Sequence, residues 1–338
     1  MFRKLFCGLF AAMLLFAPLA ANAQDAADAE LKTPSAADFG AVPILSDPVL
    51  APDGMHIAAH GTIQGKTMVL IVDVATGDRK LSKVNVPDKL QLEWLRWAGS
   101  NQVLVSVSQL DNVFGQEVRM TRLLLIDIVS GKEMLVGPRD QGIDGDDVVF
   151  VDPAGKFLLL STQPSIFEYP SVYRVDLATG KSSILVRAHD SVWNWFADSS
   201  GTVRAGIGAS EGKWWVLYRP NADGDFKRIL RSGDTDATDK HIQQFVATMG
   251  SDSGYAVADG KTGHLALYRY DFAANKLGEL LYENPKVDLD DFSIGNDGKL
   301  RSVSYTDDRA EIAWFDPEMK LQQARIDRAL PGSINRVV

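Results

Sequence analysis

The sequence predicts an all-β protein, a β-propeller of six four-stranded blades followed by the start of a seventh. A short turn phrase returns after apolar runs, and its Asp anchors run from Asp73 to Asp316 in five intervals, a period of about 49 residues that is typical of propellers and solenoids. No helical periodicity stands out between residues 43 and 320. The copies of the phrase are Asp73–Gly77, Asp127–Gly131 and Asp176–Gly180, with weaker ones at Arg219–Gly224, Asp271–Asn275 and Asp316–Lys320.

Residues 1–23 have the pattern of an export signal. Arg3 and Lys4 precede an apolar stretch, and Ala21–Ala23 offers a small-residue cleavage site. The stretch is short for a bilayer span, so a retained anchor is the weaker alternative. The single cysteine, Cys7, lies inside the signal, so the exported protein has no disulfide or thiolate metal site and depends on its core.

Cleavage after Ala23 leaves 315 residues with a net charge of −11. This acidity argues against nucleic acid and anionic membranes as partners. Residues 24–42 are rich in Ala, Asp and Glu without an apolar period, which predicts a flexible linker. No later segment is apolar and long enough to cross a membrane, so a periplasmic or secreted location is expected.

The propeller is expected over residues 43–332. In the first repeat, the turn Ala51–Gly54 separates two strands, because its Pro fixes one backbone angle and its Gly tolerates a positive one. The four strands of this repeat are Leu45–Leu50, Met55–Ile63, Thr67–Val74 and Arg79–Val84. The third strands of later repeats, rich in β-branched and aromatic residues, are Arg122–Ile128, Val172–Leu177, Trp214–Tyr218, Leu265–Tyr270 and Ile312–Phe315.

The sixth blade is expected to end near Leu330, and residues 333–338 to form the first strand of an incomplete seventh blade. A ring that lacks a blade exposes strand edges unless another segment covers them. This end is therefore expected to be either unfinished or closed in an irregular way.

One motif matches a hydrolase nucleophile, Gly208-Ala209-Ser210-Glu211-Gly212, which satisfies G-x-S-x-G. The nucleophile elbow requires a strand before the Ser and a helix after it, and here a strand, Lys213–Tyr218, follows. The sequence therefore favours a hairpin turn at Ser210.

The histidines do not form a metal site in the predicted strands. His56 and His60 are four residues apart, which spans roughly 13 Å in a strand and prevents both from binding one zinc ion. Structural roles are expected for His189, His241 and His264. No partner base for a serine is identifiable.

Acidic clusters and tryptophan pairs have similar structural interpretations. Three acidic clusters lack the ligand spacing of a calcium loop and are expected to be solvated loops, with a weak cation site as the alternative. They are Asp144–Asp147, then Asp234, Asp236 and Asp239, and then Asp288, Asp290 and Asp291. The tryptophans of first strands, expected to fill the wedge between blades, are Trp94, Trp97, Trp193 and Trp195; Trp214, Trp215 and Trp314 of third strands are interpreted likewise.

Residues Phe39–Gly54 resemble the beginning of the propeller in bacterial exported serine peptidases of the prolyl oligopeptidase family, the dipeptidyl aminopeptidase and acylaminoacyl-peptidase-like group. Residues Leu330–Val338 resemble a later point in the same propeller. The likeness covers about residues 39–338, with motifs that also occur in other periplasmic propellers, such as that of the Tol system. In that family the propeller caps an α/β-hydrolase domain and restricts access to short peptides.

The resemblance places Ser, Asp and His of the catalytic triad in the hydrolase part, which is expected to lie beyond this sequence, so no triad residue is assigned here. The paired-glutamate segment that holds a substrate's amino terminus in dipeptidyl-peptidase-like members is not found either. We therefore expect no catalytic, cofactor-binding or metal-binding residues, and a domain that is inactive as a peptidase on its own.

A stand-alone periplasmic propeller that binds or scaffolds a peptide or protein partner is the alternative. A propeller enzyme with its own site at the central channel is the weakest hypothesis, since no inward set of His, Asp or Glu can be named.

Overall fold

The computed structural model describes residues 35–40, 44–74, 81–231, 242, 244–247, 251–295, 297–335 and 337. The chain divides into two compact units, Met1–Val42 and Pro43–Val338. In the first unit the described part holds one short helix, α1 (Ala36–Phe39), inside the stretch predicted as a linker. The predicted signal and its cleavage site lie outside the described residues.

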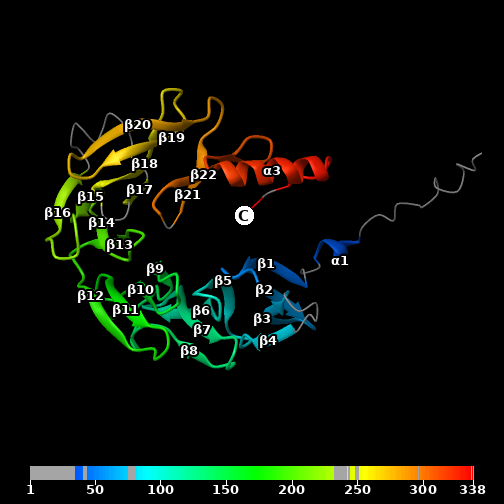
Figure 1. Cartoon of the computed structure of the whole chain (residues 1–338). Coiled ribbons are helices and arrows are strands. Elements are labelled where there is room, and N and C mark those ends of the chain that lie inside the picture. Colours follow the sequence, from blue (N-terminus) through cyan, green and yellow to red (C-terminus); the bar gives the residue numbers. More distant parts are fainter. Residues whose placement is uncertain are drawn as a thin grey trace, which may run out of the picture. The chain divides into compact units, whose positions relative to one another are not determined.

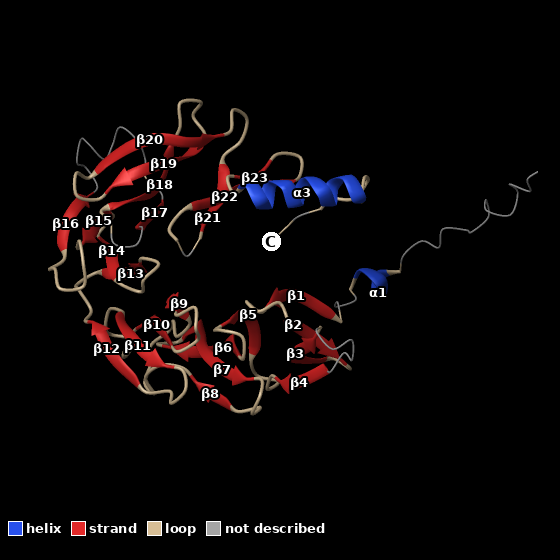
Figure 2. Ribbon diagram, viewed as in Figure 1, coloured by secondary structure: helices blue, strands red, loops and turns tan. Residues whose placement is uncertain are grey.

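The second unit is built mainly of strands, as Figures 1 and 2 show. Each strand pairs antiparallel with the next one in sequence, so that every sheet is a meander. Sheet 1 contains β1 (Leu45–Leu50), β2 (His56–Ile63), β3 (Lys66–Asp73) and β4 (Leu81–Asn85). Sheet 2 contains β5 (Gln91–Trp97), β6 (Gln102–Val113), β7 (Gln116–Asp127) and β8 (Glu133–Leu135). Sheet 3 contains β9 (Asp147–Val151), β10 (Phe157–Thr162), β11 (Ser171–Asp176) and β12 (Ser182–Val186).

The remaining three sheets repeat this order, and the last one has three strands. Sheet 4 contains β13 (Val192–Ala197), β14 (Val203–Ser210), β15 (Lys213–Tyr218) and β16 (Lys227–Arg231). Sheet 5 contains β17 (Gln244–Ala247), β18 (Ser253–Asp259), β19 (Leu265–Asp271) and β20 (Lys276–Glu283). Sheet 6 contains β21 (Leu289–Ile294), β22 (Leu300–Thr306) and β23 (Ala310–Trp314). The predicted all-β fold and its antiparallel sheets are confirmed.

In two copies of the repeated turn phrase, which join the third and fourth strands of sheets 2 and 3, the Asp makes the same hydrogen bond. The Asp127 carboxylate accepts the backbone N–H of Ser130 at 2.8 Å, and Asp176 accepts that of Thr179 at 2.8 Å. The last residue of the phrase takes a positive φ, +69° at Gly131 and +73° at Gly180, where a side chain would be strained. Local hydrogen bonding therefore makes this phrase a strand-to-strand turn.

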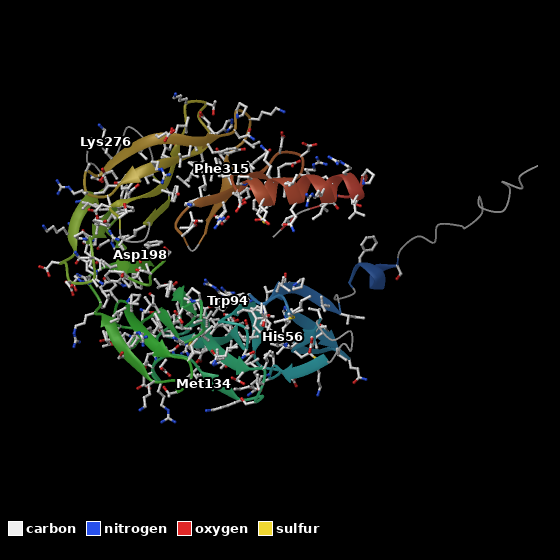
Figure 3. All side chains as sticks on the ribbon, in the orientation of Figure 1. His56, Trp94, Met134, Asp198, Lys276 and Phe315 are labelled. Carbon is white, nitrogen blue, oxygen red and sulfur yellow. The ribbon has the colours of Figure 1, made fainter. Side chains whose placement is uncertain are left out.

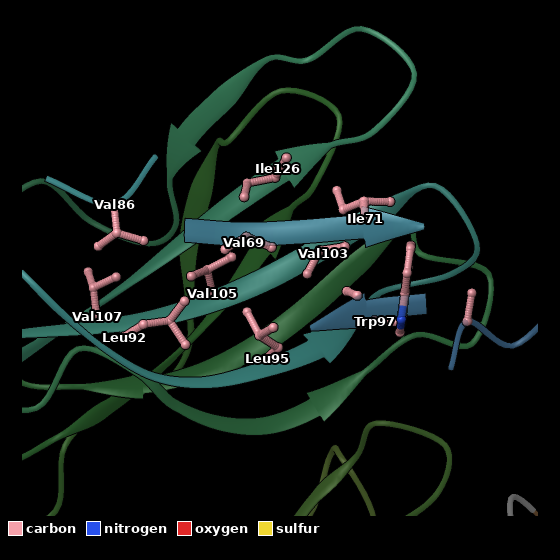
Figure 4. Packing of buried hydrophobic residues seen from close by; sticks show 12 residues of the cluster. Val69, Ile71, Val86, Leu92, Leu95, Trp97, Val103, Val105, Val107 and Ile126 are labelled. Carbon is pink, nitrogen blue, oxygen red and sulfur yellow. The ribbon is translucent and has the colours of Figure 1, made fainter. Parts of the chain in front are cut away.

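The second strand of a sheet packs against both neighbouring sheets, which explains its continuous apolar run. In β6, Val103 and Val105 belong to a cluster shared with sheet 1, whereas Leu104 belongs to one shared with sheet 3. Successive side chains of a strand point to opposite faces, so both faces of β6 are buried. Figure 4 shows the first of these clusters, in which Val69 and Ile71 from β3 meet Val103 and Val105.

Apolar clusters join every consecutive pair of sheets from sheet 1 to sheet 6. The first strands also lie beside one another, β1 beside β5, β9 beside β13 and β13 beside β17. Such packing of small meanders, each next to its neighbour in sequence, agrees with propeller blades whose first strands are innermost. Among the described strands, no sheet combines strands from the two ends of the unit.

The C-terminal end differs from the prediction. Where a fourth strand of sheet 6 was expected, the structure has a helix, α3 (Pro317–Ala329), shown in blue in Figure 2. Its N-cap is Asp316, whose side chain accepts the N–H groups of Glu318 and Met319, and Pro317 opens the first turn. The Asp that begins a hairpin turn in earlier repeats therefore begins a helix here.

The predicted seventh-blade strand at 333–338 is not found where the structure describes this segment. Residues 333–335 and 337 have no strand assignment. The segment instead folds back on α3, because Gln323 donates to the carbonyl of Asn335 at 2.8 Å and accepts the N–H of Val337 at 3.0 Å. In the described residues, neither α1 nor α3 has the length and apolar character needed to cross a membrane.

Candidate functional site

A pocket of about 530 Å³ lies between the first strands of sheets 2 and 3 and is lined by two residues of an acidic cluster, Asp146 and Asp147. Trp94, Leu95 and Arg96 come from β5, and Val148 comes from β9 with Asp147 at the start of that strand. Asp146 completes the lining from the preceding loop. Figure 3 labels Trp94 on this part of the molecule. Because an indole lies beside two carboxylates, this pocket is a candidate functional site.

The Asp146 carboxylate is occupied by donors from the neighbouring sheet. It accepts hydrogen bonds from Trp94 Nε1 at 3.0 Å, from Ser106 Oγ at 2.6 Å and from Thr121 Oγ1 at 2.5 Å. The Thr121 hydroxyl in turn accepts the N–H of Gly145 at 3.0 Å. Asp146 thus attaches the loop before β9 to three strands of sheet 2. For this residue the expectation of a solvated loop was wrong, because the carboxylate is a partly buried structural acceptor.

Asp147 is the second carboxyl group of the pocket, and its pKa is shifted. Desolvation raises its pKa to about 6, and the carboxylates of Asp146 and Asp144 add to the rise. The pKa of Asp144 is raised as well, by desolvation and by Asp146. A carboxyl group with such a pKa can exchange a proton near neutrality, although acid–base catalysis would also require a reacting group positioned against it.

The structure shows no cation-binding arrangement at the two acidic clusters that it describes. Within the described ranges, no group of three or more His, Cys, Asp or Glu side chains has an arrangement that could hold a metal ion. The predicted cluster of Asp234, Asp236 and Asp239 lies outside those ranges. In the third cluster, Asp288 accepts the backbone N–H of Leu265 at 2.7 Å, and Asp290 accepts the Thr306 hydroxyl at 2.8 Å.

Ser210 lies at the end of β14, directly before a tight turn into β15. Glu211 and Gly212 form the turn with φ of +51° and +73°, and Ser210 pairs with Lys213. Two successive positive φ angles are the mark of a two-residue hairpin. The prediction of a hairpin rather than a nucleophile elbow is confirmed, since β15 follows where a hydrolase would have a helix.

The histidines of the described part lie in separate surroundings. His56 Nδ1 lies 4.0 Å from Asp53 Oδ2, His60 Nδ1 lies 3.9 Å from Asp47 Oδ2, and His264 Nδ1 lies 3.4 Å from Asp288 Oδ1. His189 instead packs edge-on against Trp195 and Phe226. His241 lies outside the described residues.

Two first-strand tryptophans fill the wedge between sheets, as predicted. Trp97 and Trp195 are 7% and 3% exposed, and each donates its indole N–H to a carbonyl of the preceding sheet or its loop, Val49 and Pro170 respectively, at 2.9 Å. Trp193 departs from the prediction, because it is 46% exposed and meets Tyr169 edge-on.

Sequence reasoning missed a buried arginine. Arg204 on β14 is 1% exposed and binds Asp198 Oδ2 at 3.1 Å, where Asp198 is labelled in Figure 3. It also donates to the carbonyls of Arg219 and Ser251 at 2.9 Å, to Asp252 at 3.1 Å and to the hydroxyl of Tyr218. These contacts join sheet 4 to the turn that precedes β18. The signal in the sequence was an arginine inside an apolar strand close to an Asp turn.

Comparison with known proteins supports the fold. No protein-family model and no curated protein matches the sequence. Dipeptidyl peptidase 4 of Porphyromonas gingivalis aligns with 82% of this chain and 44% of its own, at 10% identity and a TM-score of 0.53. The β-propeller domain of the trilobed protease from Pyrococcus furiosus aligns with 81% of this chain and 80% of its own, at 16% identity and a TM-score of 0.48.

Acylaminoacyl peptidase of Pyrococcus horikoshii is a further structural neighbour, at 16% identity and a TM-score of 0.48 over 81% of this chain and 44% of its own. The chain thus spans less than half the length of this enzyme and of the Porphyromonas peptidase. At such identities the likeness shows the fold alone. The neighbours are propeller domains of prolyl oligopeptidase-family enzymes, which is the similarity that the sequence led us to expect.

Proposed function

We propose that the six sheets are successive blades of an exported propeller that serves as the gating part of a prolyl oligopeptidase-type serine peptidase and has no hydrolytic centre of its own. The observation that carries this proposal is the fold likeness to dipeptidyl peptidase 4, which extends over 82% of this chain but 44% of that one. The remaining length of that structure is where the resemblance would place a hydrolase domain. The role of such a propeller is to admit short peptides and exclude folded proteins.

The surroundings of Ser210 support the absence of peptidase activity. Its pocket is lined by charged and indole side chains, and no histidine is among them. In the described part of the chain, His56, His60 and His264 lie beside aspartates, and His189 lies among aromatic rings. A serine without a base is a poor nucleophile.

The test uses the purified full chain with chromogenic dipeptide amides and p-nitrophenyl esters, together with a fluorophosphonate that labels activated serines. We expect no turnover above the buffer blank and no labelling of Ser210. Turnover that a serine-directed inhibitor abolishes would refute the proposal. A Ser210→Ala variant would then show whether this serine or another is responsible.

A second candidate function is protein binding, and it is favoured by one surface feature. The long hairpin β6–β7 carries Phe114 at its tip, 79% exposed, in contact with Phe167 of the β10–β11 loop, which is 78% exposed. Exposed aromatic pairs of this kind are enriched at protein interfaces. Sequencing the gene beyond codon 338 separates the two functions: a continuation that holds G-x-S-x-G between a strand and a helix favours the peptidase, and an ordinary stop favours the binding propeller.

Export is part of the proposal and rests on the N-terminal pattern of the sequence. Mass spectrometry of protein from the periplasmic fraction is expected to find a chain that begins at Gln24, with this glutamine free or cyclised to pyroglutamate. Recovery of the protein with Met1 in the cytoplasmic fraction would contradict export.

A further inference from the structure

A second pocket, of about 320 Å³, lies on sheet 4 beside the β14–β15 hairpin and strand β16. Lys213, Arg228 and Arg231 line it together with Trp214 and Trp215, and Glu211 is the one carboxylate among the described lining residues. The chain as a whole has a net charge of −9, whereas the described lining of this pocket holds three cations and one carboxylate. Lys213 and Arg228 beside an indole make a setting suited to an anion.

The strand register places the three cations on one face of the sheet. Lys213 and Trp215 are two residues apart on β15 and therefore point to the same side. Arg231 of β16 pairs with Trp215, and Arg228 pairs with Leu217, which lies on that side too. Lys227, the neighbour of Arg228, pairs with Tyr218 and belongs to the other face.

The indole of Trp215 is held in place from two sides. Gly208 is its partner across the β14–β15 pair, and a Cβ built on Gly208 would come within 2.4 Å of the indole ring. The ring thus occupies the space of a missing side chain. The guanidinium of Arg228 stacks over the same indole at 4.6 Å from the ring centre. A guanidinium oriented in this way is well placed to present its N–H groups to a planar oxyanion.

The positive charge of the pocket is not neutralised by ion pairs of Lys213 or Arg228. Among the residues that the structure describes, neither side chain lies within ion-pair distance of a carboxylate. Cations on a last strand can also serve to prevent pairing with other proteins. The last strands β8 and β12 have no Lys or Arg and β20 has one, whereas β16 has three, so that need does not explain the concentration here.

We propose that this pocket is a binding site for a small oxyanionic ligand, a compound with two or three carboxylate or phosphate groups held by Arg228 and Lys213 against Trp215. The volume is at the lower end of the range for small-molecule sites, which suits a compound of that size. The site is on sheet 4 and is independent of the gating role proposed above.

The test is calorimetric titration of the full chain with citrate and, separately, with pyrophosphate at low ionic strength. We expect one binding site for at least one of the two anions and weaker binding as sodium chloride is added. Binding of citrate alone identifies a carboxylate ligand, and binding of pyrophosphate alone identifies a phosphate ligand. If neither anion binds, the proposal is refuted.

The matched variants are Arg228→Gln and Lys227→Gln, which remove the same charge from adjacent residues on opposite faces. Arg228→Gln is expected to weaken binding at least tenfold, and Lys227→Gln less than threefold. Equal losses would refute the site, because a general effect of net charge would then explain the binding. Gly208→Ala displaces the indole and keeps every cation, and it is expected to weaken binding. Glu211→Gln removes a negative charge from the pocket and is expected to strengthen binding. Thermal melts of each variant show whether it is folded.

Discussion

The buried Arg204 is expected to be the most costly polar side chain of the described structure to remove. Arg204→Met keeps much of the volume but leaves the Asp198 carboxylate, which is 2% exposed, without its countercharge. The carbonyls of Arg219 and Ser251 also lose a donor. Breaking a buried pair at one partner costs about 3–5 kcal/mol. Asp252 is 41% exposed and can be solvated by water, so the lower end of this range applies.

This variant is tested by urea unfolding followed by tryptophan fluorescence, and by thermal melts. For a protein of this size about 3 kcal/mol lowers Tm by roughly 4–5 °C. The control is Arg309→Met, since Arg309 is 59% exposed and a solvent-screened surface pair such as that with Glu311 contributes little to stability. A variant Arg204→Met/Asp198→Asn is expected to recover part of the loss, because no unpaired charge remains. Equal stability of Arg204→Met and Arg309→Met would refute the reasoning.

Three further predictions concern carboxylates. Asp146→Ala leaves Trp94 Nε1 and the hydroxyls of Ser106 and Thr121 without their acceptor. We therefore expect the free energy of unfolding, measured in urea, to fall by about 2–4 kcal/mol. A fall below about 0.5 kcal/mol would contradict the role of Asp146 in attaching the loop before β9 to sheet 2. Asp147→Asn is expected to raise stability at neutral pH by at most about 1 kcal/mol, because solvent screening reduces the effect of the pKa shift on the free energy of unfolding. Since the folded pKa of Asp147, about 6, lies above the unfolded value, its contribution is fully present below the unfolded pKa and is lost as pH rises through 6, so the gain should disappear in melts at acidic pH. Hydrogen bonds from Ser130 to Asp127 and from Thr179 to Asp176 lower the pKa of both carboxyl groups. Their contribution to stability is therefore present above the unfolded pKa near 3.8 and is lost as pH falls further. The dependence of Tm on pH across this window should be flatter for Asp127→Asn and Asp176→Asn, and an unchanged dependence would contradict the turn assignment.

The strand-and-turn plan was predictable because it is encoded locally. An Asp that accepts an N–H group three residues later, and a Gly that takes a positive φ, determine the turn from within the phrase itself. The predicted third strand Leu265–Tyr270 is observed as β19 (Leu265–Asp271), and Trp214–Tyr218 as β15 (Lys213–Tyr218). Alternation of apolar residues then fixes which face is buried.

The helix at the end of the unit was missed because its first residue uses the same chemistry. Asp316 accepts N–H groups as Asp127 does, so the phrase alone does not distinguish a hairpin turn from a helix start. The distinguishing signal followed it. Pro317 suits the first helical position, and the segment Glu318–Ala329 is rich in Met, Lys, Leu, Gln, Ala and Arg, with one β-branched residue, Ile326.

The pockets could not be predicted from the sequence, because their contacts join residues far apart along the chain. Asp146 meets Ser106 from 40 residues away and Trp94 from 52 residues away. Nothing near Asp146 distinguishes it from Asp144 or Asp147, which have other surroundings. In the same way, Trp215, Arg228 and Arg231 become neighbours only through the register of β15 and β16.

The sheets at the two ends of the described series have a different environment from the inner four. Among the described residues, sheet 1 shares an apolar cluster with sheet 2 alone, and sheet 6 with sheet 5 alone. Each inner sheet shares apolar clusters with the neighbouring sheet on both of its faces. In stacked modules, local opening is governed by nearest-neighbour contacts. Amide protons of β2 and β22 should therefore exchange with deuterium sooner than those of β6, β10 and β14. Local unfolding is thus expected to begin at the first and last sheets and to proceed toward the middle ones.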